Sequence, residues 1–249
     1  MKKFTRFTAQ RLHQRRGPSC QVGATMVEFA LVMPFALLLV FGIIQLGLMF
    51  SAKSIVNEGA FMAARAGAMD HAQLDPAQQD SMHQAMFRAL IPLYQDTTNG
   101  DPYTRLAGAF FNAQHDTNCN GQSCLRLEIL NPTQPAFDDF GVTAGGHTYI
   151  PNDNLEVRSH SDIGGNSGLS IQDANALKIK VTYGYEIKVP LMRSVLNSVI
   201  CGVSSGIDAF GNGDPTVNAA TDDCSNFYSQ GRIPIVAYAT VQMQTPAWQ

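Results

Sequence analysis

Residues 202–206, Gly-Val-Ser-Ser-Gly, fit the G-x-S-x-G pattern that presents a nucleophilic serine in hydrolases, with Ser204 at its centre. In that fold an acid and then a histidine follow the serine along the chain. The last histidine of this chain is His160, so a triad in that order cannot be built. The pattern therefore indicates a Gly/Ser loop beside Cys201 and not an active site.

Residues 116–128 begin like a calcium-binding loop, because polar and turn-forming residues stand at its early positions: Asp116, Asn118, Asn120 and Gly121. The bidentate acid of such a loop stands at its twelfth position. That position is Leu127, and Glu128 comes one residue late. Two interpretations stay open: an irregular calcium site, and a polar turn closed by a disulfide between Cys119 and Cys124. The pattern favours the second.

The histidines show no tight metal-ligand spacing such as H-E-x-x-H. They are spread over the chain as His13, His71, His83, His115, His147 and His160. No glycine-rich phosphate loop follows a predicted strand either. The sequence therefore predicts no catalytic residue, no cofactor and no metal site, and a protein that is not an enzyme.

Four of the five cysteines lie in the downstream part of the chain, as Cys119 with Cys124 and Cys201 with Cys224. An even number in an oxidising compartment predicts two disulfides, although four cysteines allow three pairings. We favour pairing between sequence neighbours. Free thiols in a cytosolic domain would require the opposite membrane topology.

Glu28 stands directly before 22 residues without a charge, Phe29 to Phe50. About 20 apolar residues cross the hydrocarbon core of a bilayer, so residues 29–50 are predicted to form a transmembrane segment. The run is longer than the roughly 7–15 apolar residues of a cleavable secretory signal, which predicts that it is retained. An acid in a bilayer span costs about 2.5–3.5 kcal/mol of free energy at mid-span and less near the end. The presence of Glu28 at the start of this segment therefore calls for a functional explanation.

The charge of the chain is divided unevenly. Residues 1–23 carry six basic side chains and no acid, whereas the remaining 226 residues carry 11 basic and 20 acidic ones, a net charge of −9. Basic residues beside a span stay in the cytoplasm, so the rest of the chain is predicted to be exported. The acidic body argues against binding nucleic acid, which needs a basic patch.

The helical pattern continues beyond the apolar run. Gly59, Ala63 and Gly67 recur at a spacing of four, which lets helices approach closely. One helix from Ala24 to Met69 would be roughly 70 Å long, about twice the thickness of a bilayer core. Its second half is therefore expected to pack on the exported part. Pro34 could kink the helix within its apolar part.

The remaining chain predicts an α+β domain. A helix is expected after Asp75-Pro76, with an apolar stripe over residues 82–93. A short helix is expected over 103–113, strands over 125–130, 177–189 and 233–244, a helix over 190–200, and loops over 131–175 and 201–231. The strand over 177–189 alternates apolar and polar residues throughout, and Gly184 is expected to mark a bend or bulge in it. The predicted fold is a long N-terminal transmembrane helix followed by a domain with helices packed on an antiparallel β-sheet.

The basic leader, Gly23, the stretch Ala24-Thr25-Met26-Val27, Glu28-Phe29 and the apolar helix together resemble the prepilin peptidase site of type IV pilin-like proteins. With Ala-Ala-Arg-Ala-Gly-Ala over residues 63–68, the stretch is similar more narrowly to the TadE-like proteins of the tight-adherence (Flp-type) pilus machinery. Residues 176–244 resemble that family more loosely.

The resemblance implies a minor pilin or pseudopilin that a prepilin peptidase cleaves between Gly23 and Ala24. The implied organisation is a leader over residues 1–23, a helix over 24–69 and a periplasmic domain over 70–249, in the bacterial inner membrane or later in an extracellular pilus. Glu28 and Phe29 would act in assembly, with Glu28 pairing with the new α-amine of a neighbouring subunit. The implied partners are other pilin or pseudopilin subunits, the prepilin peptidase, the inner-membrane assembly platform and the lipid bilayer.

Other interpretations remain. Glu28 could simply lie in the headgroup layer, where an acid stabilises the positive end of a helix. The chain could then be a membrane-tethered periplasmic binding or adhesion module that is not processed. A tethered enzyme is a third class, for which the sequence offers no active-site constellation.

Overall fold

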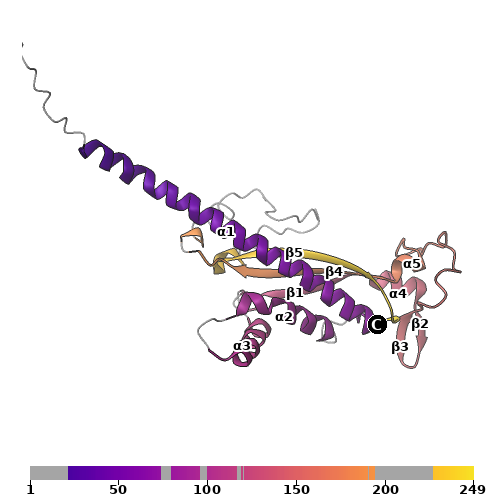
Figure 1. Cartoon of the computed structure of the whole chain (residues 1–249). Helices are drawn as coiled ribbons and strands as arrows, with labels where there is room; N and C mark the ends of the chain where they lie inside the picture. The colour runs from indigo at the N-terminus through magenta and orange to yellow at the C-terminus, as the bar shows by residue number, and fades with distance from the viewer. Residues whose placement is uncertain are drawn as a thin grey trace, which may run out of the picture. The chain divides into compact units, whose positions relative to one another are not determined.

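The computed structural model describes residues 22–73, 80–95, 100–116, 119, 121–189, 191–193 and 227–249. The described residues fall into two compact units, which divide between Val40 and Phe41. Figure 1 shows the elements along the chain.

The first element is a 48-residue helix, α1 (Val22–Met69), which contains Pro34. The predicted helix over 24–69 is confirmed and begins two residues earlier. In the first unit, every residue from Met26 to Val40 is exposed. In the second unit the same helix buries one face, which includes Ala52, Val56 and Ala60.

Two shorter helices follow in the second unit, α2 (Asp80–Tyr94) and α3 (Pro102–Gln114). The predicted apolar stripe of α2 is buried at Met82, Met86 and Leu90. The helix predicted over 103–113 is confirmed as α3, which Asp101 caps by accepting a hydrogen bond from the Thr104 backbone N–H at 2.9 Å. The predicted start at Asp75-Pro76 lies outside the described residues.

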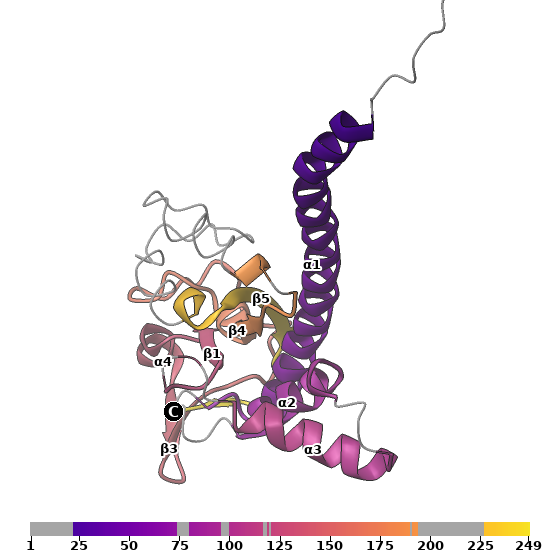
Figure 2. The ribbon, with the colours of Figure 1, turned by 90° about the vertical axis from the view of Figure 1, so that its left-hand side faces the viewer.

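The main sheet is antiparallel, with the order β1 (Leu125–Asn131), β4 (Ala176–Glu186) and β5 (Arg232–Gln242). Leu177, Ile179 and Val181 of β4 are completely buried, as their alternation with polar residues predicts. These side chains form one apolar core with the buried face of α1 and with α2. In Figure 2, α1 and α2 lie beside the sheet. The predicted α+β class is therefore confirmed.

The predicted strand 177–189 is three residues too long, because β4 ends at Glu186. Its partner strand begins at Arg232, which is paired with Glu186. The residue before it, Gly231, has a φ of 72°, so the chain turns away from the ladder at that point.

Of the bend or bulge predicted at Gly184, the bulge is wrong, since the register of β4 with β5 is continuous through the pair Gly184–Pro234. A Cβ atom at Gly184 would lie 2.7 Å from Cδ1 of Phe227. The glycine is therefore needed for the close approach of an aromatic ring. The register shift of this sheet lies in β1, between Ile129 and Asn131.

The prediction that residues 131–175 form loops is also wrong. They contain α4 (Gln134–Phe140), β2 (Val142–Ala144), β3 (His147–Ile150) and α5 (Ile171–Ala174). The hairpin β2–β3 turns at Gly145 and Gly146, which both have positive φ, as two-residue hairpin turns require. These elements are too short to show a clear hydrophobic period, so turn residues dominate the pattern of the segment.

β5 confirms the strand predicted over 233–244, but it is not the last strand. β6 (Ala247–Trp248) follows and pairs with β3 in a second small sheet, β2-β3-β6. The helix predicted over 190–200 and the loop over 201–231 lie largely outside the described residues, apart from 191–193 and a 3-10 turn, η2 (Tyr228–Gln230).

Candidate functional site: the N-terminal helix and a buried ion pair

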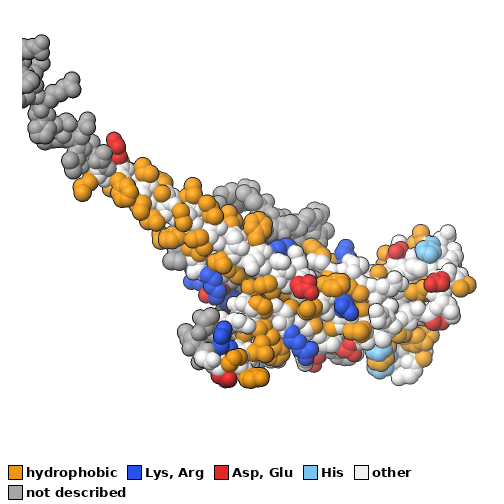
Figure 3. All heavy atoms as spheres, viewed as in Figure 1, with side chains coloured by type: hydrophobic (Ala, Val, Ile, Leu, Met, Phe, Trp, Pro, Cys, Tyr) orange, Lys and Arg blue, Asp and Glu red, His pale blue; other side chains and the backbone are white. Residues whose placement is uncertain are grey.

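The N-terminal part of α1 is an apolar helix that no described part of the protein covers. Phe29 and Phe35 are 65% and 75% exposed, and all other side chains from Met26 to Val40 are exposed as well. Figure 3 shows hydrophobic side chains over most of this surface. Among the described residues, α1 is the one helix long and apolar enough to cross a membrane. A helix that is apolar all round requires an apolar environment, either lipid or other helices.

The predicted processing and assembly residues all lie within the first two turns of α1. Ala24 and Glu28 are four residues apart in the helix, so they share one face about one turn apart. Glu28 and Phe29 are exposed. For Gly23 and Ala24 the structure describes the helical backbone only.

The residues of α1 predicted to pack against another helix, Gly59, Ala63 and Gly67, lie on the face of α1 that α2 of the same chain contacts. A Cβ atom at Gly59 would lie 2.6 Å from Sδ of Met86, and one at Gly67 would lie 2.5 Å from Sδ of Met82. Ala63, between them, is completely buried. Small residues at this spacing therefore let α2 approach α1 closely, and this face of α1 is not available to a second subunit.

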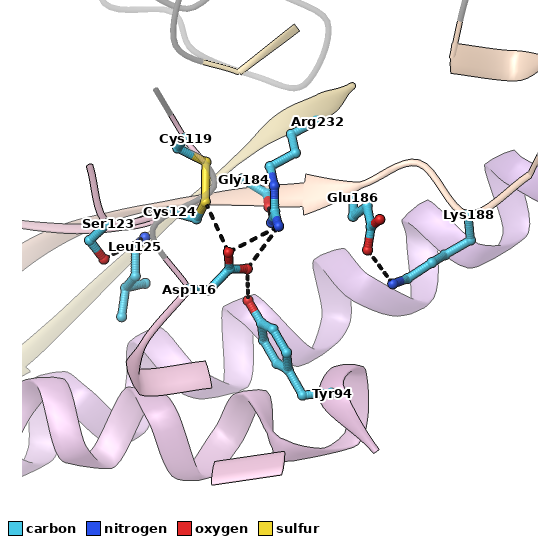
Figure 4. Close-up of polar contacts among 10 residues, drawn as sticks. All are labelled: Tyr94, Asp116, Cys119, Ser123, Cys124, Leu125, Gly184, Glu186, Lys188 and Arg232. Carbon is cyan, nitrogen blue, oxygen red and sulfur yellow. Dashed lines mark hydrogen bonds and ion pairs between the residues drawn. A yellow bond between two sulfur atoms is a disulfide. The ribbon is translucent and has the colours of Figure 1, made fainter. Parts of the chain in front are cut away.

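A buried ion pair joins the segment after α3 to the start of β5 (Figure 4). Nη2 of Arg232 lies 2.9 Å from Oδ2 and 3.0 Å from Oδ1 of Asp116. Only 7% and 6% of the two side chains are exposed. Tyr94 donates its hydroxyl to Oδ2 of Asp116 at 2.6 Å, and Nη1 of Arg232 donates to the Gly184 carbonyl at 2.8 Å. Both charges are thus compensated by partners, as buried charges must be.

The Cys119–Cys124 disulfide lies directly beside this pair. The Cys124 backbone N–H donates to the Asp116 carbonyl at 3.0 Å, and its Sγ contacts Oδ1 of Asp116 at 3.6 Å. The neighbour pairing favoured for these two cysteines is present, whereas Cys201 and Cys224 lie outside the described residues. Because Arg232 and Tyr94 bind the Asp116 carboxylate, it is not presented to a cation. Among the described residues no cluster of metal-binding side chains occurs.

Two tyrosines of this cluster titrate at high pH. Burial raises the pKa of Tyr183 to about 12. Burial also raises the pKa of Tyr94, and the neighbouring Tyr183 and Asp116 raise it further. The two rings meet edge to face, with centroids 6.4 Å apart. Both phenols therefore stay neutral at physiological pH.

A hollow of about 320 Å³ opens beside the ion pair. Its lining includes Leu93, Tyr94, Tyr183, Tyr185, Glu186 and Lys188. Three tyrosine rings and two pairs of opposite charges give it a mixed aromatic and polar surface, which is more polar than the mainly apolar lining of most small-ligand pockets.

The C-terminal residues fasten the end of α1. The Ala68 carbonyl accepts hydrogen bonds from the Gln244 and Thr245 backbone N–H groups, at 3.0 and 3.2 Å. The Trp248 ring stacks on His71 and His147, with centroid distances of 3.7 and 4.9 Å. We call this arrangement the C-terminal clasp. It compensates the Ala68 carbonyl, one of the groups that a helix end would otherwise leave unpaired.

Sequence reasoning missed the roles of Tyr94, Arg232 and Trp248. Arg232 carries a partial signal, since a lone charge directly before an apolar strand requires a buried partner. The sequence does not indicate which of 20 acids that partner is. The sequence does single out Asp116, but as the first residue of a possible calcium loop and not as the partner of a buried arginine.

Residues 23–65 match the family model of the TadE-like proteins. No curated protein and no solved structure matches the chain. The matched segment covers most of α1, including the predicted processing and assembly residues. The resemblance noted in the sequence is thereby confirmed for this segment, and it suggests that the chain takes part in the assembly of tight-adherence pili.

Proposed function

We propose that the chain is a minor pilin or pseudopilin of a tight-adherence pilus, a structural protein and not an enzyme. It would be held in the inner membrane by one pass of α1, with the leader in the cytoplasm and the α+β domain in the periplasm. The observation that carries the proposal is the stretch Met26–Val40, which is apolar and exposed all round, with the single carboxylate of Glu28 at its start.

Processing and assembly use the first turns of α1. A prepilin peptidase hydrolyses the peptide bond between Gly23 and Ala24, which leaves an α-amine on Ala24. When subunits leave the bilayer and their helices form a bundle, Glu28 of one subunit pairs with the amine of its neighbour. A carboxylate buried among apolar helices is stable only with such a partner. A subunit in the wrong register leaves it unpaired, so Glu28 selects the register.

The domain contributes partner specificity. Gly59 and Gly67 are already packed against α2, so other subunits and the assembly platform would contact the remaining faces of α1 and the domain surface. Phe61 and Met62 lie on such a face, with 46% and 44% of their surface exposed.

The proposal is tested by the intact mass and N-terminal sequence of the protein from membranes, with and without a prepilin peptidase. A new terminus at Ala24 that depends on the peptidase is expected. The Glu28→Ala variant should be processed and yet fail to enter filaments. Glu58→Ala, which removes an exposed acid from the same helix, is the matched control and should assemble normally. An unprocessed chain in its natural host would overturn the proposal.

The hollow beside Tyr94 and Tyr183 favours one alternative, a membrane-tethered periplasmic binding module. This function predicts no cleavage at Gly23 and full tolerance of Glu28→Ala. The same mass measurement therefore separates the two functions.

A further inference from the structure

The domain packs on α1 before the apolar run has ended. Gln45 and Met49 lie within that run, yet they are only 2% and 4% exposed. The Val189 backbone N–H, just after β4, donates to Oε1 of Gln45 at 3.1 Å. The opposite face of the same turns remains apolar and open, with Ile43 and Phe50 61% and 66% exposed.

Because of this contact, the domain cannot lie entirely outside the bilayer that α1 spans. A hydrocarbon core of about 30 Å takes up about 20 helical residues. Counted from Phe29, directly after the charge of Glu28, the core ends near Leu48. The domain already contacts α1 at Gln45, so about one turn of helix, roughly 5 Å, must lie at membrane depth and beside the domain. Tilting α1 would bring still more residues into the core and seat the domain deeper.

The residues after β4 are suited to such a position. Leu191 is 66% exposed and has a φ of 67°, which is rare for a bulky side chain. It follows Val189 by two residues, so its Cα lies within about 7 Å of the Val189 Cα. Lys188 and Arg193 are exposed on either side, and Met192 is buried in the core. Apolar side chains that lie 5–10 Å into the boundary of headgroups and acyl chains are commonly accompanied by Lys and Arg on the polar side, and Leu191 with its two basic neighbours has this composition.

We propose that Leu191, flanked by Lys188 and Arg193, inserts into the outer boundary of the bilayer that holds α1, and so seats the domain on the membrane before assembly. The occupant of this surface is lipid. Lys188 pairs with Glu186 at 2.5 Å, so the three charged side chains carry a net charge of +1 and the contact is mainly apolar. This inference rests on the membrane anchor of the proposed function.

The test uses the full chain in lipid vesicles. Trp248 is the only tryptophan, so Trp248→Phe gives a silent background in which Leu191→Trp reports on depth. Its emission is expected to shift to the blue and to be quenched by lipids with a nitroxide near the headgroup. The blue shift should increase as the acyl chains lengthen, because a thicker core reaches further along α1 and surrounds the indole more completely. Quenching should be similar in neutral and anionic vesicles.

Two matched probes make the outcomes distinct. Phe35→Trp lies in the apolar helix and reports on the anchor. Val157→Trp is the second probe, because the Val157 side chain is 88% exposed. The carbonyl of the next residue, Arg158, accepts a hydrogen bond from Gln172 of α5, which lies just before the start of β4. β4 has 11 residues, so Val157 and Leu191 flank opposite ends of a strand of roughly 35 Å. Quenching at Phe35→Trp without quenching at Leu191→Trp would overturn the inference alone. Lack of quenching at both would overturn the anchor with it, and equal quenching at Val157→Trp would show unspecific adsorption and contradict the inference.

Discussion

Arg232 and Asp116 are 116 residues apart in the chain and form an ion pair in the interior of the domain, in which Nη2 of Arg232 lies 2.9 and 3.0 Å from the two carboxylate oxygens of Asp116. The pair ties the segment after α3 to the first residue of β5. Removing one partner leaves the other charge buried without compensation.

Asp116→Asn is therefore expected to lower the free energy of unfolding by about 3–5 kcal/mol. The measurement is urea unfolding of the full chain in detergent, followed by near-UV circular dichroism. Glu186→Gln is the control, because its pair with Lys188 has side chains 44% and 51% exposed and such pairs contribute about 0–1 kcal/mol. Equal effects of the two substitutions would contradict the assignment.

The Cys119–Cys124 disulfide closes a short loop, for which the chain-entropy relation gives a stabilisation of about 2 kcal/mol. The paired substitution to serine should lower the unfolding free energy by about that amount. It should also weaken the effect of Asp116→Asn, because the Asp116 carbonyl and carboxylate both contact Cys124. Strict additivity in a double-mutant cycle would show that the disulfide and the ion pair are independent.

Gly184→Ala is expected to destabilise the domain by about 1–3 kcal/mol, because the new methyl group would overlap the Phe227 ring at 2.7–2.8 Å. Gly108→Ala serves as the opposite case. It lies within α3 with no atom within 4 Å of the added Cβ, and a helical Gly→Ala change stabilises by about 0.5–1 kcal/mol. Thermal unfolding of both variants should therefore shift in opposite directions. A shift in the same direction would disprove the close approach of Phe227.

Alkaline pH should lower the free energy of unfolding of the domain, because Tyr183 lies in its interior. The pKa of Tyr183 is raised to about 12 from a usual value near 10, so the folded state holds the phenol proton more tightly than the unfolded state does. This contribution to stability is complete below pH 10 and is lost as the pH rises towards 12. Urea unfolding between pH 9 and 12 should show this loss in the native chain, and Tyr183→Phe should reduce it. If the loss keeps the same slope in Tyr183→Phe, another group must be responsible for it.

Much of the fold follows from periodicity. The helix over residues 24–69, the stripe of α2 and the strands β1, β4 and β5 each repeat a hydrophobic pattern long enough to be recognised, and the sequence predicts each of them to within a few residues. The hairpin β2–β3, with strands of three and four residues, is too short for that. Its Gly145-Gly146 turn is the available signal, and within a segment rich in turn residues it indicates a loop as readily as a hairpin.

The site is predictable only where it is local. Gly23, Ala24, Glu28 and Phe29 form a contiguous motif, and Cys119 and Cys124 are neighbours in sequence. The contacts of Arg232 with Asp116, and of Trp248 with His71, join residues more than 100 positions apart. No period or spacing encodes such pairs, since they depend on the register of β5 and on the path of the chain after it.

The C-terminal clasp has a consequence for the order of biogenesis. The end of α1 is closed by residues 244–248, which the ribosome adds 175 residues or more after Met69, the last residue of α1. In the proposed topology α1 enters the bilayer while most of the domain is still unmade. The alanine and glycine face of α1 therefore stays without its sheet until β4 and β5 have been translocated. The C-terminal clasp can therefore form only after residues 244–248 have been translocated, and a chain truncated before Gln244 lacks it.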